Sequence, residues 1–177
     1  MRKIGIIAVL SLMALALAAV PALAATTASA TATDITRTGG LHFTTAPTAT
    51  ATLLNNTATL SATGEVAGAG STGGTADLSA TAEVTRGCVT PPGNNEPSGL
   101  VRTSETTSGT VNFPTTRNGR GSFTVSTTPI TIAGFSCPSA NMTPVLVSVT
   151  YTDITLTVTS QTGSTTATFP DLTVTRT

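Results

Sequence analysis

The sequence is short of the residue types on which most chemistry at a protein site depends. Its 177 residues include no tryptophan, one tyrosine, one histidine and two cysteines, and only 9% of them are charged. Zinc sites usually combine several His and Cys ligands, and a sugar hydrolase needs two carboxylates in a cleft that holds the sugar, normally against aromatic rings. These shortages argue against a metalloenzyme and against a sugar hydrolase.

Positive charge is also scarce. Lys3 is the only lysine, and beyond residue 24 the chain has six arginines against eight acidic residues, a net side-chain charge of about −2. Binding to nucleic acid depends on clustered positive charge, and so does binding to an anionic membrane surface. We therefore expect neither of these partners for the chain.

Residues 1–24 have the pattern of a secretory signal peptide. A positively charged start is followed by an almost wholly apolar run over 4–20 and by small residues at Ala22 and Ala24. This order predicts cleavage between Ala24 and Ala25. A permanent membrane anchor is the alternative, but a run of about 17 residues is at the lower limit for a membrane span. We expect the processed chain to be secreted, extracellular or at the cell surface, without a membrane span.

Threonine dominates the remaining composition. It accounts for 42 of the 177 residues, and its β-branched side chain fits a pleated strand better than a helix. A disordered or O-glycosylated stalk can have a similar composition. However, apolar and polar residues alternate over several segments, which is typical of strands with one buried face. The pattern therefore predicts an all-β protein.

Three local patterns predict how the strands connect. The alternating segments 57–66 and 76–84 flank a glycine-rich turn and predict a hairpin with one apolar face. Asn118-Gly119 predicts a second hairpin, because both central residues of a two-residue turn need a positive φ. Around Thr152-Asp153 the apolar residues change parity, which predicts a bulge or a bend.

About eight to ten strands, without helical periodicity after residue 24, favour a two-sheet β-sandwich of immunoglobulin-like character. A closed β-barrel is the alternative. We expect three segments along the chain: a signal peptide over 1–24, a flexible N-terminal segment over 25–39, where alternation is not sustained, and a single β-sandwich domain over 40–177.

Cys88 and Cys137 are the only cysteines. Outside the cell, two cysteines are expected to form a disulfide bond. The alternative is a reactive thiol or a metal ligand. It has little support, because neither cysteine has a histidine within 40 residues and the chain has no Cys-x-x-Cys motif.

The other candidate sites fit structural roles better. Residues 68–73 match Gly-x-Gly-x-x-Gly, but a dinucleotide site needs a helix after this loop, and the pattern here predicts a strand. His42 is expected to be an exposed strand residue, and the carboxylates lie in predicted turns or on polar faces. We therefore expect no catalytic, metal or cofactor site.

Arg117, Asn118 and Arg120 form a possible interaction loop. The two arginines flank the expected Asn-Gly turn, and Arg102 is expected nearby. A positively charged tip could contact an acidic partner, although a solvated turn is the simpler interpretation.

The sequence contains three further short motifs: Cys-x4-Gly-Asn-Asn-x-Pro-x-Gly from Cys88, Thr116-Arg117-Asn118-Gly119-Arg120, and Cys137-Pro138. These motifs resemble those of a group of small secreted bacterial β-proteins, rich in Thr and Ala and of unknown function. The resemblance covers about 41–177 and implies turns and a disulfide. The composition is also similar to that of the apoproteins of enediyne chromoproteins, immunoglobulin-like carriers of a small apolar ligand. Those proteins have two disulfides, whereas this chain has cysteines for one.

The sequence thus favours a non-enzymatic secreted or cell-surface module with a structural or interaction role. The expected partner is an unknown protein or envelope component, or a second copy that associates through a Thr-rich face or an edge strand. A small-ligand carrier is the alternative, and it needs an apolar pocket of several hundred Å³. The many small residues at core positions favour a filled core instead. A secreted hydrolase is the remote alternative.

Overall fold

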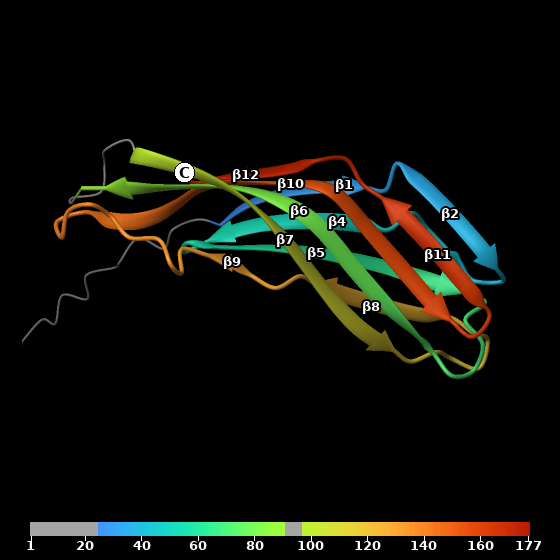
Figure 1. Cartoon of the computed structure of the whole chain (residues 1–177). Coiled ribbons are helices and arrows are strands. Elements are labelled where there is room, and N and C mark those ends of the chain that lie inside the picture. Colours follow the sequence, from blue (N-terminus) through green and yellow to red (C-terminus); the bar gives the residue numbers. More distant parts are fainter. Residues whose placement is uncertain (1–24, 91–96) are drawn as a thin grey trace, which may run out of the picture.

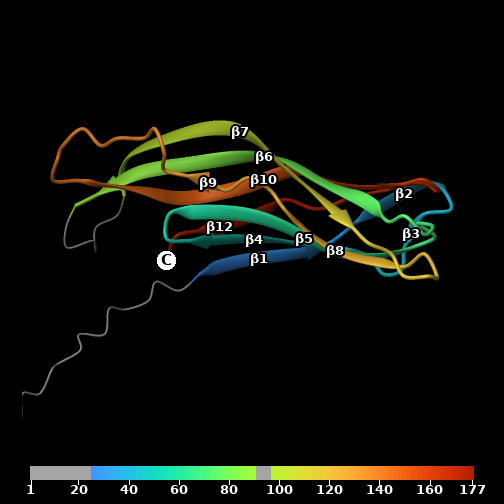
Figure 2. The same cartoon turned by 90° about the horizontal axis from the view of Figure 1, so that it is seen from below.

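A computed structural model describes residues 25–90 and 97–177 and shows an all-β protein (Figures 1 and 2). Two antiparallel sheets, A and B, lie face to face. Within the described residues no strand pair joins the sheets, so the fold is a two-sheet β-sandwich, as predicted, and not a closed barrel. Its immunoglobulin-like character stays a prediction. The predicted signal peptide, 1–24, lies outside the described residues.

Sheet A is built around β5. Its strands are β1 (Thr26–Thr31), β3 (His42–Phe43), β4 (Thr48–Leu54), β5 (Thr57–Ala67), β8 (Gly121–Ser126) and β9 (Ile130–Thr131). β3 and β4 pair with one side of β5, and β8 and β9 pair with the other. β1 pairs with β4 at the edge of the sheet.

Sheet B is built around β10. Its strands are β2 (Asp34–Gly39), β6 (Gly74–Val89), β7 (Ser98–Phe113), β10 (Thr143–Ser160), β11 (Gly163–Thr168) and β12 (Leu172–Thr175). β6 pairs with one side of β10, and β11 and β12 pair with the other. β7 pairs with β6, and β2 pairs with β11, so β7 and β2 are edge strands.

Proline interrupts several strands. Pro129 separates β8 from β9, and Pro170 lies between β11 and β12, whereas Pro114 follows the end of β7. Proline has no N–H to donate to a ladder, so it is found at strand ends, edges and bends. These three prolines therefore lie between strands or directly after one.

The core lies between the two sheets. Alternate residues of β5 and β6, such as Leu60 and Leu78, are buried as predicted. The predicted hairpin between these strands is wrong, because β5 belongs to sheet A and β6 to sheet B, and 68–73 crosses from one sheet to the other. Alternation shows which face of a strand is buried, but not which strand lies beside it.

β10 contains two irregularities. Its register with β6 shifts between Thr152 and Thr155, where Asp153 has a φ of 51°. This is the predicted bulge, and beyond it Ile154 is buried. A second register shift, at Leu146, is not predicted by the parity of the valines, and it places this leucine in the core.

Two Asn-containing turns differ in their backbone. Asn55-Asn56 joins β4 to β5 with a positive φ at both residues (49° and 61°), as a two-residue hairpin turn requires. At the predicted Asn118-Gly119 turn only the glycine has a positive φ (67°). The Gly119 N–H donates to the Thr116 carbonyl oxygen (2.9 Å), and the Thr116 N–H donates to that of Arg120 (2.8 Å). This turn connects β7 of sheet B to β8 of sheet A, so the predicted second hairpin is also wrong.

Residues 25–39 do not form the flexible segment expected from the sequence. β1 pairs with β4 along its whole length, and β2 pairs with β11. Ala28 and Ala30 of β1 pack against the core. Their alternation with threonine and serine is a weak signal, because alanine buries little apolar surface. The sandwich therefore begins at β1 rather than at residue 40.

Candidate functional site

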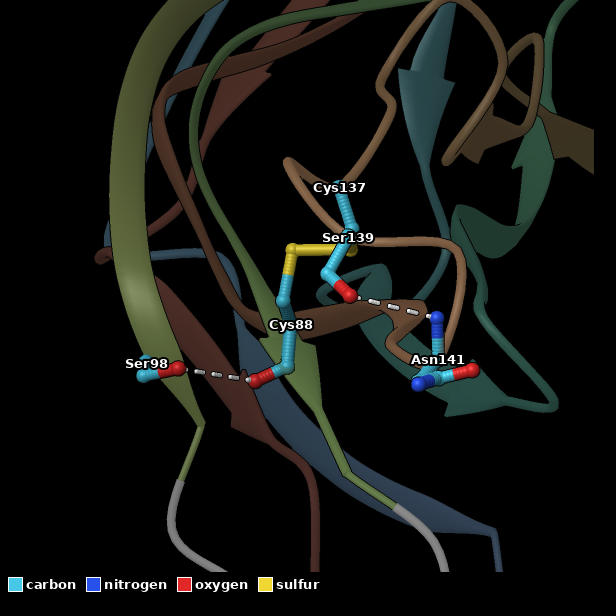
Figure 3. The surroundings of a disulfide bond; sticks show 5 residues. All are labelled: Cys88, Ser98, Cys137, Ser139 and Asn141. Carbon is cyan, nitrogen blue, oxygen red and sulfur yellow. Dashed lines mark hydrogen bonds between the residues drawn. A yellow bond between two sulfur atoms is a disulfide. The ribbon is translucent and has the colours of Figure 1, made fainter.

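A disulfide bond ties one end of the sandwich. Cys88, near the end of β6, is bonded to Cys137 in the segment 132–142 between β9 and β10 (Figure 3). The two Cα atoms are 5.9 Å apart, and the residues are 49 positions apart in the sequence. The Ser98 hydroxyl donates to the Cys88 carbonyl oxygen (3.5 Å), so β7 begins beside the bond. The predicted disulfide is confirmed, and it anchors a long connection to the end of sheet B.

Arg86 is a buried arginine that is not among the residues predicted from the sequence. Its side chain lies between the sheets and is 9% exposed. The Nε and Nη2 atoms donate to the Thr131 carbonyl oxygen of β9 (3.2 and 2.9 Å). Nη2 also donates to the Glu105 carboxylate, and Nη1 to the Thr103 hydroxyl, both at 2.7 Å. Arg86 therefore links β6 and β7 to sheet A. Its parity, which is that of the buried Cys88, is the signal that could have identified it.

The outer face of sheet B contains a shallow polar hollow of about 540 Å³. Two rows of neighbouring residues on β7, β6 and β10 line it: Arg102, Thr85 and Ser148 in one row, and Ser104, Glu83 and Thr150 in the next. We call these six residues the sheet B hollow. Among the described residues, neither of its two charged side chains forms an ion pair. The hollow therefore presents one charge of each sign among hydroxyl groups.

The first half of β7 is an open edge, here called the β7 edge (98–106). Every residue of this segment except Glu105 is exposed, and Leu100 and Val101 are 55% and 45% exposed. In the described part of the chain, β7 has only β6 as a strand partner. Further along β7, the segment after β8 approaches the edge, and the Thr128 N–H donates to the Ser108 carbonyl oxygen (2.9 Å). The β7 edge therefore begins at the disulfide end and stops before this contact.

The predicted interaction loop lies at the opposite end of the sandwich from the disulfide (Figure 1). Arg117, Asn118 and Arg120 are all exposed. An Arg120 Nη1 atom lies 3.5 Å from a Glu65 carboxylate oxygen, so this arginine has an acidic neighbour within the chain. Arg102 is not nearby, because about 35 Å of extended strand separate it from the loop. Binding of a partner at this loop stays a prediction.

His42 and the glycine-rich loop have structural surroundings. His42 lies in β3 and is half-buried rather than exposed, with its Nδ1 atom 3.0 Å from the Gly40 carbonyl oxygen. The loop at 68–73 is followed by strand β6, as predicted. Over 25–90 and 97–177, no group of three or more His, Cys, Asp or Glu residues could hold a metal ion.

Tyr151 is the largest fully buried side chain of the core. Its hydroxyl has no hydrogen-bond partner among the described residues. Burial raises the pKa of this hydroxyl, because the ionised form would be poorly solvated. Tyr151 lies opposite Ala82 of β6 and Leu172 of β12 in the ladders of sheet B, which makes it a packing residue.

The geometry thus offers two neighbouring surfaces for contact, the sheet B hollow and the β7 edge, which share Arg102 and Ser104. In the two stretches that the structure describes, no helix is long and apolar enough to span a membrane. Compared with protein-family models, curated proteins and solved structures, the chain matches none of them.

Proposed function

We propose that the chain is a secreted or cell-surface, non-enzymatic β-sandwich of immunoglobulin-like character that acts as a structural or interaction module. The observation that carries this proposal is the filled space between the sheets. Apolar side chains from both sheets form one buried cluster there, and many of them are alanines, which let the sheets approach closely. A protein of this kind acts through its outer surface and needs no internal pocket.

At Gly109, on the edge of sheet B, the end of β8 and the residues after it come into direct contact with β7. A Cβ atom at this position of β7 would lie 1.9 Å from the carbonyl oxygen of Ser126 at the end of β8. β7 and β8 belong to opposite sheets, and the short distance shows that their backbones are in contact at this point. A ligand carrier needs an apolar pocket of several hundred Å³, and this contact leaves no room for one at this point. The contact therefore favours the structural role over the carrier.

Two features support a location outside the cell. The Cys88–Cys137 disulfide is typical of an oxidising compartment, and the pattern of residues 1–24 is that of an export signal. The outer faces also suit contact with water, because they carry many hydroxyl side chains. Some of these hydroxyls also bond to a hydroxyl of the neighbouring strand. One such pair is Thr150 and Thr173, whose Oγ1 atoms are 3.0 Å apart.

Native mass spectrometry of the chain recovered from the culture medium of its own cells tests this proposal. We expect the mass of the processed, disulfide-bonded chain, alone, as multimers or with another protein, and without a small molecule. The same sample measured after unfolding is the control, because a bound molecule is released on unfolding and a covalent modification is not. A small molecule present in a one-to-one ratio would contradict the proposal and favour the carrier.

A further inference from the structure

On the β7 edge, the backbone N–H and C=O groups that point away from β6 belong to the even-numbered residues. In an antiparallel pair, residues of one parity bond to the neighbouring strand, and those of the other parity direct their N–H and C=O groups away from it. The Ser108 carbonyl oxygen accepts from Thr128, outside the β6–β7 ladder, so the even-numbered residues of β7 point away from β6. Within 25–90 and 97–177, Arg102, Ser104 and Thr106 therefore offer unpaired backbone groups along the edge.

We propose that β7 of one copy pairs antiparallel with β7 of a second copy, with the two Thr103 residues opposite each other. This inference rests on the proposed function and deepens it, because it names the partner and the surface of self-association. In this two-fold arrangement Arg102 lies opposite Ser104 of the second copy. Both residues have outward-pointing backbone groups, so they can exchange hydrogen bonds and join the two B sheets into one.

Charge complementarity selects a second copy as the occupant of the edge. Glu83 and Ser104 are neighbours in the β6–β7 register. Arg102 of one copy therefore lies in line with Ser104 and then Glu83 of the second copy. Neighbouring strands are about 4.8 Å apart, so the Cα atoms of Arg102 and of Glu83 in the second copy are about 10 Å apart. The extended arginine and glutamate side chains cover this distance, because the serine between them is small. Two-fold symmetry repeats this contact, and both charges of each sheet B hollow gain a partner.

The exposed apolar residues also fit an added strand. Leu100 and Val101 are both exposed and lie on opposite faces of sheet B, because Val101 is paired with the inward-pointing Arg86, whereas the Leu100 side chain lies against the position of a Cβ on Gly87, the next residue of β6. A surface packed against one face would cover only one of them, whereas a neighbouring strand places side chains beside both. In the proposed register Thr106 of the second copy lies opposite Leu100, and Glu105 of the second copy lies opposite Val101.

The contact is short and therefore weak. Stable protein interfaces bury about 1,600 Å² in total, which an edge of this length does not reach. We expect a dimer at protein concentrations of about 100 µM rather than in the nanomolar range. A weak contact of this kind becomes effective where copies are crowded, as they are on a surface or in a matrix.

Charge-reversal variants and their mixture test the register. In sedimentation-velocity experiments on the processed, disulfide-bonded chain, we expect Arg102→Glu and Glu83→Arg each to weaken association about tenfold or more, because each variant alone places like charges across the interface. An equimolar mixture of the two variants restores a dimer, since every contact between the two variants then joins opposite charges. Arg117→Glu is the matched control: it changes the net charge as Arg102→Glu does, at an exposed turn far from the edge.

Ser104→Pro tests the edge without changing charge. It removes an N–H that points away from β6, so we expect loss of the dimer with an unchanged circular dichroism spectrum and unchanged thermal unfolding. The proposal is overturned if the wild-type chain stays monomeric at about 1 mM, well above the weak range, or if the mixture of charge variants does not associate. Association that is equally strong in all variants also overturns it and leaves the proposed structural role intact. A co-purifying small ligand, by contrast, contradicts the proposed function alone.

Discussion

At the scale of single residues, Arg86 of β6 joins the two sheets, because its guanidinium donates to β7 in sheet B and to β9 in sheet A. We expect Arg86→Ala to lower the free energy of unfolding by about 3 kcal/mol, because it leaves the Thr131 carbonyl oxygen without its side-chain donor and the Glu105 carboxylate without its ion-pair partner, so that of the two side chains that donate to Glu105 only the Thr103 hydroxyl remains. Glu105→Gln should cost no more than about 1 kcal/mol, since the Glu105 side chain is 39% exposed and an amide oxygen still accepts a hydrogen bond. Urea unfolding of the disulfide-bonded proteins measures both values. Equal losses of stability in the two variants would contradict the conclusion that the buried arginine matters more to stability than its partly exposed partner.

Parity in the sequence identified most of the core residues and the bulge at Asp153. It could have identified Arg86 as well, but a charged residue in an apolar row is more often solvated than buried. Its burial depends on the Thr131 carbonyl oxygen, 45 residues away in the sequence. Leu146 was missed for a different reason. The register shift beside it reverses the parity of 143–146 relative to 148–152 of β10, and neighbouring valines hide that change.

At the scale of strands, the sequence predicts faces better than neighbours. The apolar faces of β5 and β6 are correct, but the strands lie in opposite sheets. The same holds for β7 and β8. A glycine-rich turn between two alternating segments is compatible with a hairpin and also with a crossing between layers. The choice depends on contacts that are distant in the sequence, such as the pairing of β8 with β5.

The close approach of the sheets makes a prediction for two glycines. We expect Gly109→Ala to lower the free energy of unfolding by about 2 kcal/mol or more, because its Cβ would meet the Ser126 backbone, which cannot move as a side chain can. Gly40→Ala is the control, since a Cβ there meets nothing within 4 Å and its φ is not positive. It should change stability by less than about 0.5 kcal/mol. Thermal unfolding of both variants provides the comparison, and similar stability of the two would show that the layers are not in contact at Gly109.

At the scale of the whole molecule, the all-β class, the two-sheet sandwich and the disulfide could be predicted from the sequence. The place where the fold begins could not, because β1 and β2 bury little more than alanines and are held by pairing with β4 and β11. The two contact surfaces could not be predicted either. The sheet B hollow depends on the register of three strands, and the β7 edge depends on the order of strands in the sheet.

The disulfide acts on the whole chain, since it closes a loop that contains β7, β8 and β9. Replacing both Cys88 and Cys137 by alanine should lower the free energy of unfolding by about 4 kcal/mol, because the unfolded chain regains the entropy of a 49-residue loop. For a domain of this size the expected fall in Tm is about 10 °C. Calorimetry of the wild-type and double-variant proteins, with and without reductant, measures it. Reductant should destabilise only the wild type, because the variant has no bond to lose. A fall in Tm of less than about 2 °C would contradict this expectation. It would show that loss of the disulfide also stabilises the native state of the variant, by about as much as the added entropy stabilises its unfolded state.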